Sequence, residues 1–119
     1  MIQAAIASLH AEAPRDWPQI AALYGELAAL TDSPVVELNR AIAVAEADGP
    51  QAGIAIVERL PLADYRYWHA TRGELLHRLE RIEESRDAFR RALELTRDEA
   101  ERRLLERRLA EPDLTETQP

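Results

Sequence analysis

The sequence predicts an all-helical protein, and three observations support this prediction. Ala supplies 21 of the 119 residues and Leu 16, whereas aromatic residues make up only 5%, a composition that favours helix over sheet. Apolar residues recur at helical spacing, for example at Ile20, Leu23, Tyr24 and Leu27. Proline and glycine also divide the chain at near-regular intervals. With 46% apolar residues, the chain is long enough to form one domain with a core.

Capping signals set the boundaries of the expected helices. Five residues of types that favour helix N-caps precede apolar runs: Asp16, Ser33, Gly49, Asp64 and Thr96. Ser33 and Gly49 are each followed directly by Pro, which is common in the first turn of a helix. Asp16 with Gln19, and Thr96 with Glu99, have the spacing of a capping box. These signals predict seven helices, near residues 2–13, 16–31, 34–47, 50–60, 64–79, 82–96 and 98–110, followed by a flexible acidic tail at 112–119.

The expected helices form pairs that repeat along the chain. A small residue recurs in the first helix of each pair, 33 and then 32 residues apart, at Ser8, Ala41 and Gly73. The second helices keep the same register. Their equivalent positions, each followed four residues later by a large side chain, are Ile20, Gly53 and Ser85, with Tyr24, Val57 and Phe89. A period near 34 with this order of small and large residues is typical of tetratricopeptide (TPR) repeats.

The repeats predict a TPR-like right-handed superhelix over residues 1–111, with about three helix pairs and a C-terminal capping helix. In that last helix Ala100, Leu104, Leu105 and Leu109 lie on one apolar face, opposite Arg and Glu. Such an amphipathic helix is what a repeat array needs to cover the end of its core.

Charge and composition exclude several classes of function. The formal net charge is −7, and all 15 basic residues are Arg. An acidic domain has no electrostatic footprint for a phosphate backbone, so we expect no direct binding of nucleic acid. No apolar run approaches the roughly 18 residues of a membrane span, and no basic segment precedes Ile2–Leu9 as in a signal peptide. We therefore expect a cytoplasmic protein without membrane contact.

No catalytic or cofactor chemistry is predicted. The chain has no cysteine, which removes disulfides, thiolate metal sites and cysteine nucleophiles. The three histidines, His10, His69 and His77, lack the spacing of a metal site. Ser8 lies two residues from His10, so on a helix their side chains diverge by about 200°. We therefore expect neither an enzyme nor a bound cofactor or metal.

An interaction surface is expected on the inner wall of the repeat array, which the first helix of each pair forms. An apolar floor with scattered polar groups suits a helix or an extended segment of a partner protein. The alternative interpretation is a wall that is solvated or covered within the molecule. The residues that the repeat register places on this wall are Val35, Leu38, Asn39, Ile42, Glu46, Tyr67, Ala70, Thr71, Glu74, His77 and Arg78.

Charged residues elsewhere allow two interpretations. Arg40 and Arg72 occupy equivalent places in successive repeats, where each either pairs with an acidic residue of this chain or meets a partner. The Arg- and Glu-rich run from Glu74 to Glu111 contains acid-first pairs at i,i+4 spacing, such as Glu99 with Arg103. Such pairs stabilise a solvated helix face by about 0.2–0.5 kcal/mol each.

Three stretches resemble one known region. They read QAAIASLHAEA, then DWPQIAALYGELAALTDSPVVELNRAIAVAEADGPQAGIAIVERL, then GELLHRLERIEESRDAFRRALELTRDEAERRLLERRLAE. Together they are similar to the C-terminal TPR-like extension of a subgroup of bacterial extracytoplasmic-function (ECF) sigma factors. The most specific parts run from Ser33 through Pro50 and from Glu101 to Leu109. The resemblance covers about residues 2–111.

The resemblance implies a role in transcription initiation through protein contacts. The implied partners are the sigma domains of a parent factor, RNA polymerase or a regulatory protein. The two sigma domains that bind polymerase and promoter DNA in this family are absent from this chain, so promoter recognition is not carried over. Two alternatives stay open: a free-standing TPR adaptor unrelated to transcription, and a homodimer formed through an exposed first helix.

Overall fold

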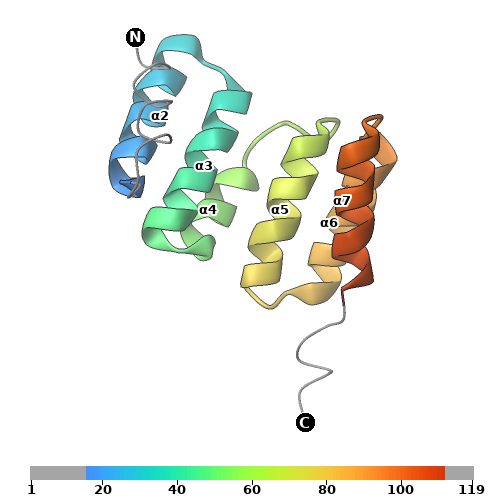
Figure 1. Ribbon diagram of the computed structural model, residues 1–119. Coiled ribbons are helices and arrows are strands. Elements are labelled where there is room, and N and C mark those ends of the chain that lie inside the picture. Colours follow the sequence, from blue (N-terminus) through green and yellow to red (C-terminus); the bar gives the residue numbers. More distant parts are fainter. Residues whose placement is uncertain (1–15, 112–119) are drawn as a thin grey trace. The chain divides into compact units, whose positions relative to one another are not determined.

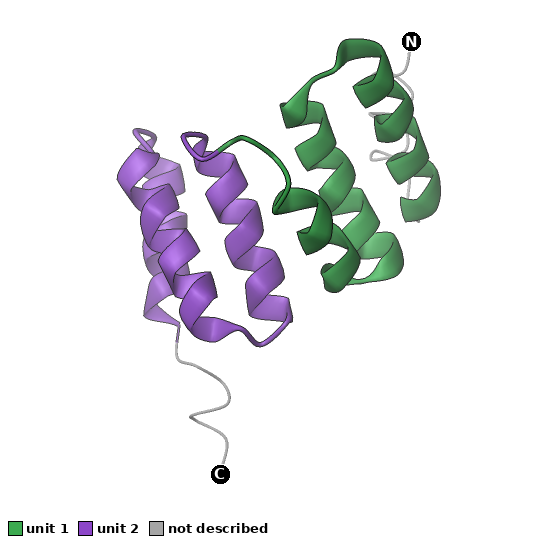
Figure 2. Ribbon diagram, turned by 180° about the vertical axis from the view of Figure 1, so that it is seen from behind, with its two compact units in different colours: residues 1–62 green, residues 63–119 purple. Residues whose placement is uncertain are grey.

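The computed structural model describes residues 16–111, which form six α-helices and no strand (Figure 1). The predicted all-helical class is confirmed for this part of the chain. The helix expected near 2–13, including Ser8 and His10, and the tail at 112–119 lie outside the described residues. The helices divide into two units, residues 1–62 and residues 63–119 (Figure 2).

Unit 1 contains α2 (Trp17–Thr31), α3 (Pro34–Asp48) and α4 (Pro50–Val57). The predicted cap of α2 is confirmed, because the Asp16 carboxylate accepts a hydrogen bond from the backbone N–H of Gln19 at 3.1 Å. The predicted cap of α3 is confirmed as well, since the Ser33 hydroxyl accepts from the N–H of Val36 at 3.3 Å. Both contacts satisfy N–H groups that have no partner within the helix.

The α3–α4 turn depends on Gly49. Its φ angle is 101°, a conformation that side chains disfavour and glycine accepts, and Pro50 follows in the first turn of α4. The end of α4 comes at Val57, three residues before the predicted end. Residues 58–60 tighten into a turn with backbone bonds that span three residues, and Pro61 then prevents continuation of the helix.

The core of unit 1 depends on small residues where α3 meets α4. A Cβ atom added at Gly53 would lie 2.6 Å from the Cβ of Ala45 and 2.9 Å from the carbonyl oxygen of Ala41. The two helices therefore approach too closely for any side chain at this position. Ala41 and Val57 are fully buried, as the repeat pattern predicts. The other buried apolar residues of the unit are Ile20, Leu38, Ala43, Ala45, Ile54 and Ile56.

Unit 2 contains α5 (Arg66–Arg78), α6 (Ile82–Leu95) and α7 (Glu99–Ala110). Two predicted caps are wrong here. The N-cap of α5 is Tyr65 and not Asp64, and no side-chain hydrogen bond caps this end. The N-cap of α7 is Asp98, whose carboxylate accepts from the N–H of Glu101 at 2.9 Å. The Thr96 hydroxyl donates instead to the Glu101 carboxylate at 2.9 Å.

The end of α5 is a Schellman motif with an unusual residue. The N–H of Arg81 donates to the carbonyl of Leu76 at 2.9 Å, and the N–H of Glu80 donates to the carbonyl of His77 at 3.0 Å. These two bonds define the motif, whose central residue adopts a left-handed conformation and is usually glycine. Here that residue is Glu80, with φ 61°. The turn therefore places a glutamate at a position whose backbone conformation favours glycine.

The core of unit 2 is built on Phe89. Its ring lies against Gly73, where an added Cβ would come within 2.8 Å of the ring. The Ser85 hydroxyl, fully buried, donates to the Gly73 carbonyl at 2.7 Å. Phe89 packs in one cluster with Ala92 of α6 and Leu105 of α7. The predicted pairing of small and large residues in this repeat is therefore confirmed, and Ser85 stabilises it with a buried hydrogen bond.

The charged surface departs from simple i,i+4 pairing. Glu99 and Arg103 lie 3.9 Å apart as predicted. Arg40 pairs within its own helix, its Nε 2.6 Å from the Glu37 carboxylate, and the guanidinium of Arg72 lies 5.9 Å from the ring centroid of Trp68. Both Arg residues thus have partners inside this chain. No helix of the described part is long and apolar enough to cross a membrane.

Candidate functional site

In unit 1, the predicted interaction surface is an exposed line along α3. Val35, Asn39, Ile42 and Glu46 share one side of the helix and are all exposed, because their spacings of four, three and four residues follow the helical period. Val35 and Ile42 each expose 38% of their surface. This line is apolar at two positions and carries one amide and one carboxylate.

Leu38, also predicted for this surface, belongs to the core. It is 3% exposed, so its side chain is not available to a partner. The physical reason is that α3 packs against both α2 and α4. A helix that packs against two neighbours buries a wide face, and on α3 this face includes Leu38. The exposed inner face is therefore narrower than the repeat register predicts.

In unit 2, two of the residues predicted on α5, Tyr67 and Glu74, form hydrogen bonds to α7. Tyr67 is 41% exposed, Arg78 is exposed, and Ala70, Thr71, Glu74 and His77 are half-buried. The Glu74 carboxylate accepts two hydrogen bonds from the guanidinium of Arg108, at 2.8 and 2.9 Å. The inner face of α5 is therefore one wall of a site whose other wall is α7.

Three residues donate to the carboxylate of Glu101 on α7, two from α5 and one from the position directly after α6. The carboxylate accepts from Arg66 Nε at 2.7 Å, from Thr96 Oγ1 at 2.9 Å and from the Tyr67 hydroxyl. The hydrogen bonds from Tyr67 and Arg66 lower the pKa of Glu101 from its ordinary 4.5 to about 2. The bond to the same carboxylate raises the pKa of Tyr67. Glu101 is therefore charged across the physiological range and binds the start of α5 to the start of α7.

A second set of contacts joins the other ends of these two helices. Arg108 bridges from Glu74 of α5 to Glu111 directly after α7, with the latter contact at 2.5 Å. Its guanidinium also lies 5.3 Å from the ring centroid of Phe89. The planar guanidinium binds a carboxylate through two parallel bonds, which fixes direction as well as distance.

An apolar pocket lies beside the first of these two sets, the one at Glu101. It has a volume of about 160 Å³, and its lining is almost entirely carbon. Figure 1 shows α5 and α7 beside each other with α6 behind. Leu104, on the α7 side, is 52% exposed. We name this feature the α5–α7 pocket, lined by Arg66, Tyr67, Ala70, Ala92, Glu101, Leu104 and Leu105.

Sequence reasoning missed the contribution of α7 to this site. The expected apolar face of α7 exists only in part: Leu105 is buried, Leu109 is half-buried, and Leu104 and Ala100 are exposed. A signal for the missed contacts was present. Tyr67 and Glu101 are 34 residues apart, as are Glu74 and Arg108. This separation is one repeat period, so α7 follows α5 as the first helix of a next pair would. Equivalent residues of successive first helices are neighbours in such an array.

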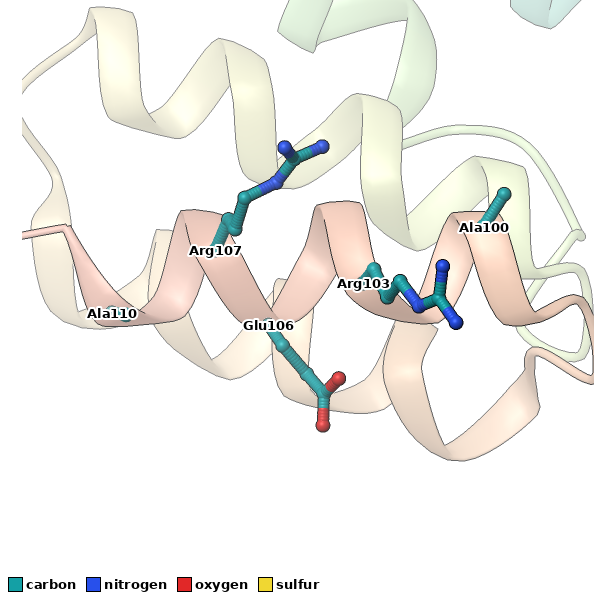
Figure 3. Close-up of a pocket in the computed structure, with 5 residues that line it drawn as sticks. All are labelled: Ala100, Arg103, Glu106, Arg107 and Ala110. Atoms are coloured by element: carbon teal, nitrogen blue, oxygen red, sulfur yellow. The ribbon is translucent and has the colours of Figure 1, made fainter.

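A shallow hollow along the outside of α7 is a different feature. Its described lining consists of Ala100, Arg103, Glu106, Arg107 and Ala110 (Figure 3). In this view the Arg107 side chain points towards the side of α7 on which α5 lies, whereas Glu106 points the other way.

Neither histidine of the described part belongs to a group that could hold a metal ion. The Nε2 atom of His69 lies 2.6 Å from the carbonyl oxygen of Ala63, and His77 lies beside Phe89 and Arg108. Within residues 16–111, no group of three or more histidine, aspartate or glutamate side chains is placed to hold a metal ion.

Comparison with known proteins gives one informative match. An uncharacterized protein of Rhizobium meliloti (strain 1021) is 50% identical over 106 residues, covering 84% of this chain and 25% of that protein. The chain therefore spans about a quarter of the length of the curated relative it matches. No protein-family model and no solved structure matches the chain.

Proposed function

We propose that this chain is a non-catalytic protein-binding domain, a TPR-like right-handed superhelix of about three helix pairs with α7 as its C-terminal cap. The observation that carries the proposal is the shared construction of the two units. Each unit contains one helix pair, α3 with α4 or α5 with α6, in which a small residue of the first helix meets a small residue of the second, and a large side chain follows four residues later. The sets are Ala41, Gly53 and Val57 in unit 1 and Gly73, Ser85 and Phe89 in unit 2.

We propose further that the domain acts in transcription initiation, as the C-terminal region of ECF-type sigma factors does. The resemblance from Ser33 to Pro50 and from Glu101 to Leu109 supports this assignment. Its partners are then the sigma domains of a parent factor, RNA polymerase or a regulatory protein, and its location is the cytoplasm. The net charge of −7 favours protein partners over direct contact with nucleic acid.

Exposed apolar side chains on the first helix of each pair supply a contact surface on each unit. Val35 and Ile42 on α3 and Tyr67 on α5 each expose more than a third of their surface. Large side chains of this kind carry much of the energy of protein interfaces when a partner desolvates them. The surface requires no cofactor.

The test measures binding of the full 119-residue chain to three purified baits. These are the sigma domains of an ECF factor of this subgroup with its own extension removed, core RNA polymerase, and their complex. We expect binding to at least one bait, and weakening by Ile42→Asp combined with Tyr67→Ala, since both side chains are exposed. Leu30→Asp is the matched control, because Leu30 is 75% exposed and lies outside the proposed surface. Binding to none of the baits rejects the sigma domains and RNA polymerase as partners and favours a regulatory protein or the role of a free-standing adaptor.

A further inference from the structure

The α3–α4 turn contains the dipeptide Asp48–Gly49, in which a carboxylate lies beside a backbone nitrogen that no side chain shields. Asp48 is the last residue of α3 and is exposed. Apart from the two chain neighbours of Gly49, no heavy atom of residues 16–111 lies within 4 Å of the position that a Cβ would take there. Of the seven aspartates in the sequence, only Asp48 precedes glycine. The surroundings of this peptide bond are therefore open to a reaction between the two residues.

The reaction that this dipeptide permits is the closure of a succinimide ring. The Gly49 nitrogen attacks Cγ of Asp48 and loses its proton, while a C–O bond of the protonated carboxyl breaks and one water leaves. Water then adds to the main-chain carbonyl carbon of Asp48 and breaks the bond from that carbon to the Gly49 nitrogen. The product is isoaspartate, whose main chain passes through Cβ and Cγ. One water leaves and one water returns, so the rearrangement requires no other reactant.

One hydrogen bond in the structure opposes this reaction. The N–H of Gly49 donates to the carbonyl oxygen of Ala45 at 2.9 Å, so the nitrogen is directed along α3 and not towards the Asp48 side chain. Helical residues also have ψ near −42°, and ψ of Asp48 must leave this value before the five-membered ring can close. The last turn of a helix opens more easily than the core of a protein. The reaction therefore requires the α3–α4 turn to open.

We propose that Asp48–Gly49 is a site of spontaneous isoaspartate formation, and that the hydrogen bond from Gly49 to Ala45 controls its rate. This inference is independent of the proposed function. Isoaspartate adds one atom to the main chain between α3 and α4 and leaves a free carboxylate at the negative end of the α3 dipole. The helices have no room for such a displacement, because a Cβ at Gly53 would already lie 2.6 Å from that of Ala45. The modification therefore destabilises unit 1.

The site can be followed in the full chain by mass spectrometry after incubation at mildly acidic pH. Trypsin releases residues 41–59, in which Asp48 is the only aspartate, and electron-transfer fragmentation identifies isoaspartate by cleavage of its Cα–Cβ bond. Residues 60–66 form the control peptide, in which Asp64 precedes Tyr65. In urea-unfolded protein, Asp48 should react at least about tenfold faster than Asp64, because glycine lets the nitrogen approach closely. Equal rates at the two aspartates would overturn the proposal.

The control of the rate by the Gly49 hydrogen bond is tested in the folded protein. A peptide of residues 46–51 with blocked ends gives the rate without the turn, and hydrogen exchange of the Gly49 N–H gives the fraction of time in which the bond is open. We expect the folded protein to react more slowly than the peptide by the exchange protection factor, within about threefold. A folded protein that reacts as fast as the peptide would overturn the proposal. So would a lack of isoaspartate after the time that this factor predicts.

Two variants of the exposed Asp48 complete the test. Asp48→Asn closes the same ring by losing ammonia and should form isoaspartate faster than the unmodified chain, whereas Asp48→Ser cannot close the ring. During incubation the Tm of the unmodified chain should fall as isoaspartate accumulates, while the Tm of Asp48→Ser stays constant. An equal fall in both proteins would show that the loss of stability arises elsewhere, and would contradict the effect on unit 1.

Discussion

Replacing Gly53 by alanine should destabilise unit 1, although alanine is the better helix former. The added Cβ would lie 2.6 Å from the Cβ of Ala45, whereas ordinary contacts begin at 3.4 Å. The helices α3 and α4 must therefore separate by about 0.8 Å at this point. Both Ala45 Cβ and the nearby Ala41 oxygen are fixed to the backbone, so rotation of a side chain cannot relieve the contact.

The magnitude follows from two opposing effects. Overpacking in a core costs typically 1–3 kcal/mol, and a clash against backbone belongs at the upper end of that range. The change from glycine to alanine inside a helix raises the free energy of unfolding by about 1 kcal/mol, because alanine has the higher helix propensity. We expect a net loss of about 2 kcal/mol in the free energy of unfolding. For a chain of this length, that loss lowers Tm by about 8 °C.

The measurement is urea and thermal unfolding followed by circular dichroism. Gly25→Ala in α2 is the matched control, since among the described residues its Cβ would meet only Arg40 Cδ, at an ordinary 3.5 Å. That variant should gain about 0.5–1 kcal/mol. A Gly53→Ala protein as stable as the unmodified chain would refute the close packing of α3 on α4.

Three further changes test other parts of the structure. Glu80→Gly should raise the free energy of unfolding by about 1 kcal/mol, because φ 61° suits glycine; a loss of stability in urea unfolding would contradict the assigned turn. Ser33→Ala should cost about 1 kcal/mol by removing the cap of α3, and Ser33→Asp should restore most of it in the same assay. Glu101 has a folded pKa of about 2, below its ordinary 4.5, so its stabilising effect is complete above about pH 4.5 and disappears as the pH falls towards 2. The unmodified protein should therefore lose more stability than Glu101→Gln between pH 5 and pH 2, and parallel pH profiles of Tm would argue against this network.

Local signals predicted the helices well where a single residue could act as the cap. Ser33 followed by Pro34 allows only one N-cap position, and α3 begins directly after Ser33. Near α7 both Thr96 and Asp98 have side chains that can cap, and the Thr96 hydroxyl donates to the Glu101 carboxylate instead. No short-range pattern contains that information, because the Glu101 carboxylate is held there by Arg66, 35 residues earlier.

The candidate site was predicted in part for a related reason. The repeat register identified the inner residues of α3 and α5, and Val35, Ile42 and Tyr67 are exposed there. It could not show that Leu38 faces the core, because burial depends on how many helices surround α3. The sequence analysis also assigned α7 only the role of a capping helix. The repeat period nevertheless places Glu101 one repeat after Tyr67, and the two side chains are in contact.

The ion pairs between α5 and α7 have a consequence for how the two helices separate. Since Arg66 with Glu101 and Arg108 with Glu74 join them at two places, the helices cannot move apart without breaking two charged contacts. The entropy of ordering these side chains is already spent in folding. We therefore expect α7 to open together with α5, so that their backbone N–H groups show similar protection in native-state hydrogen exchange.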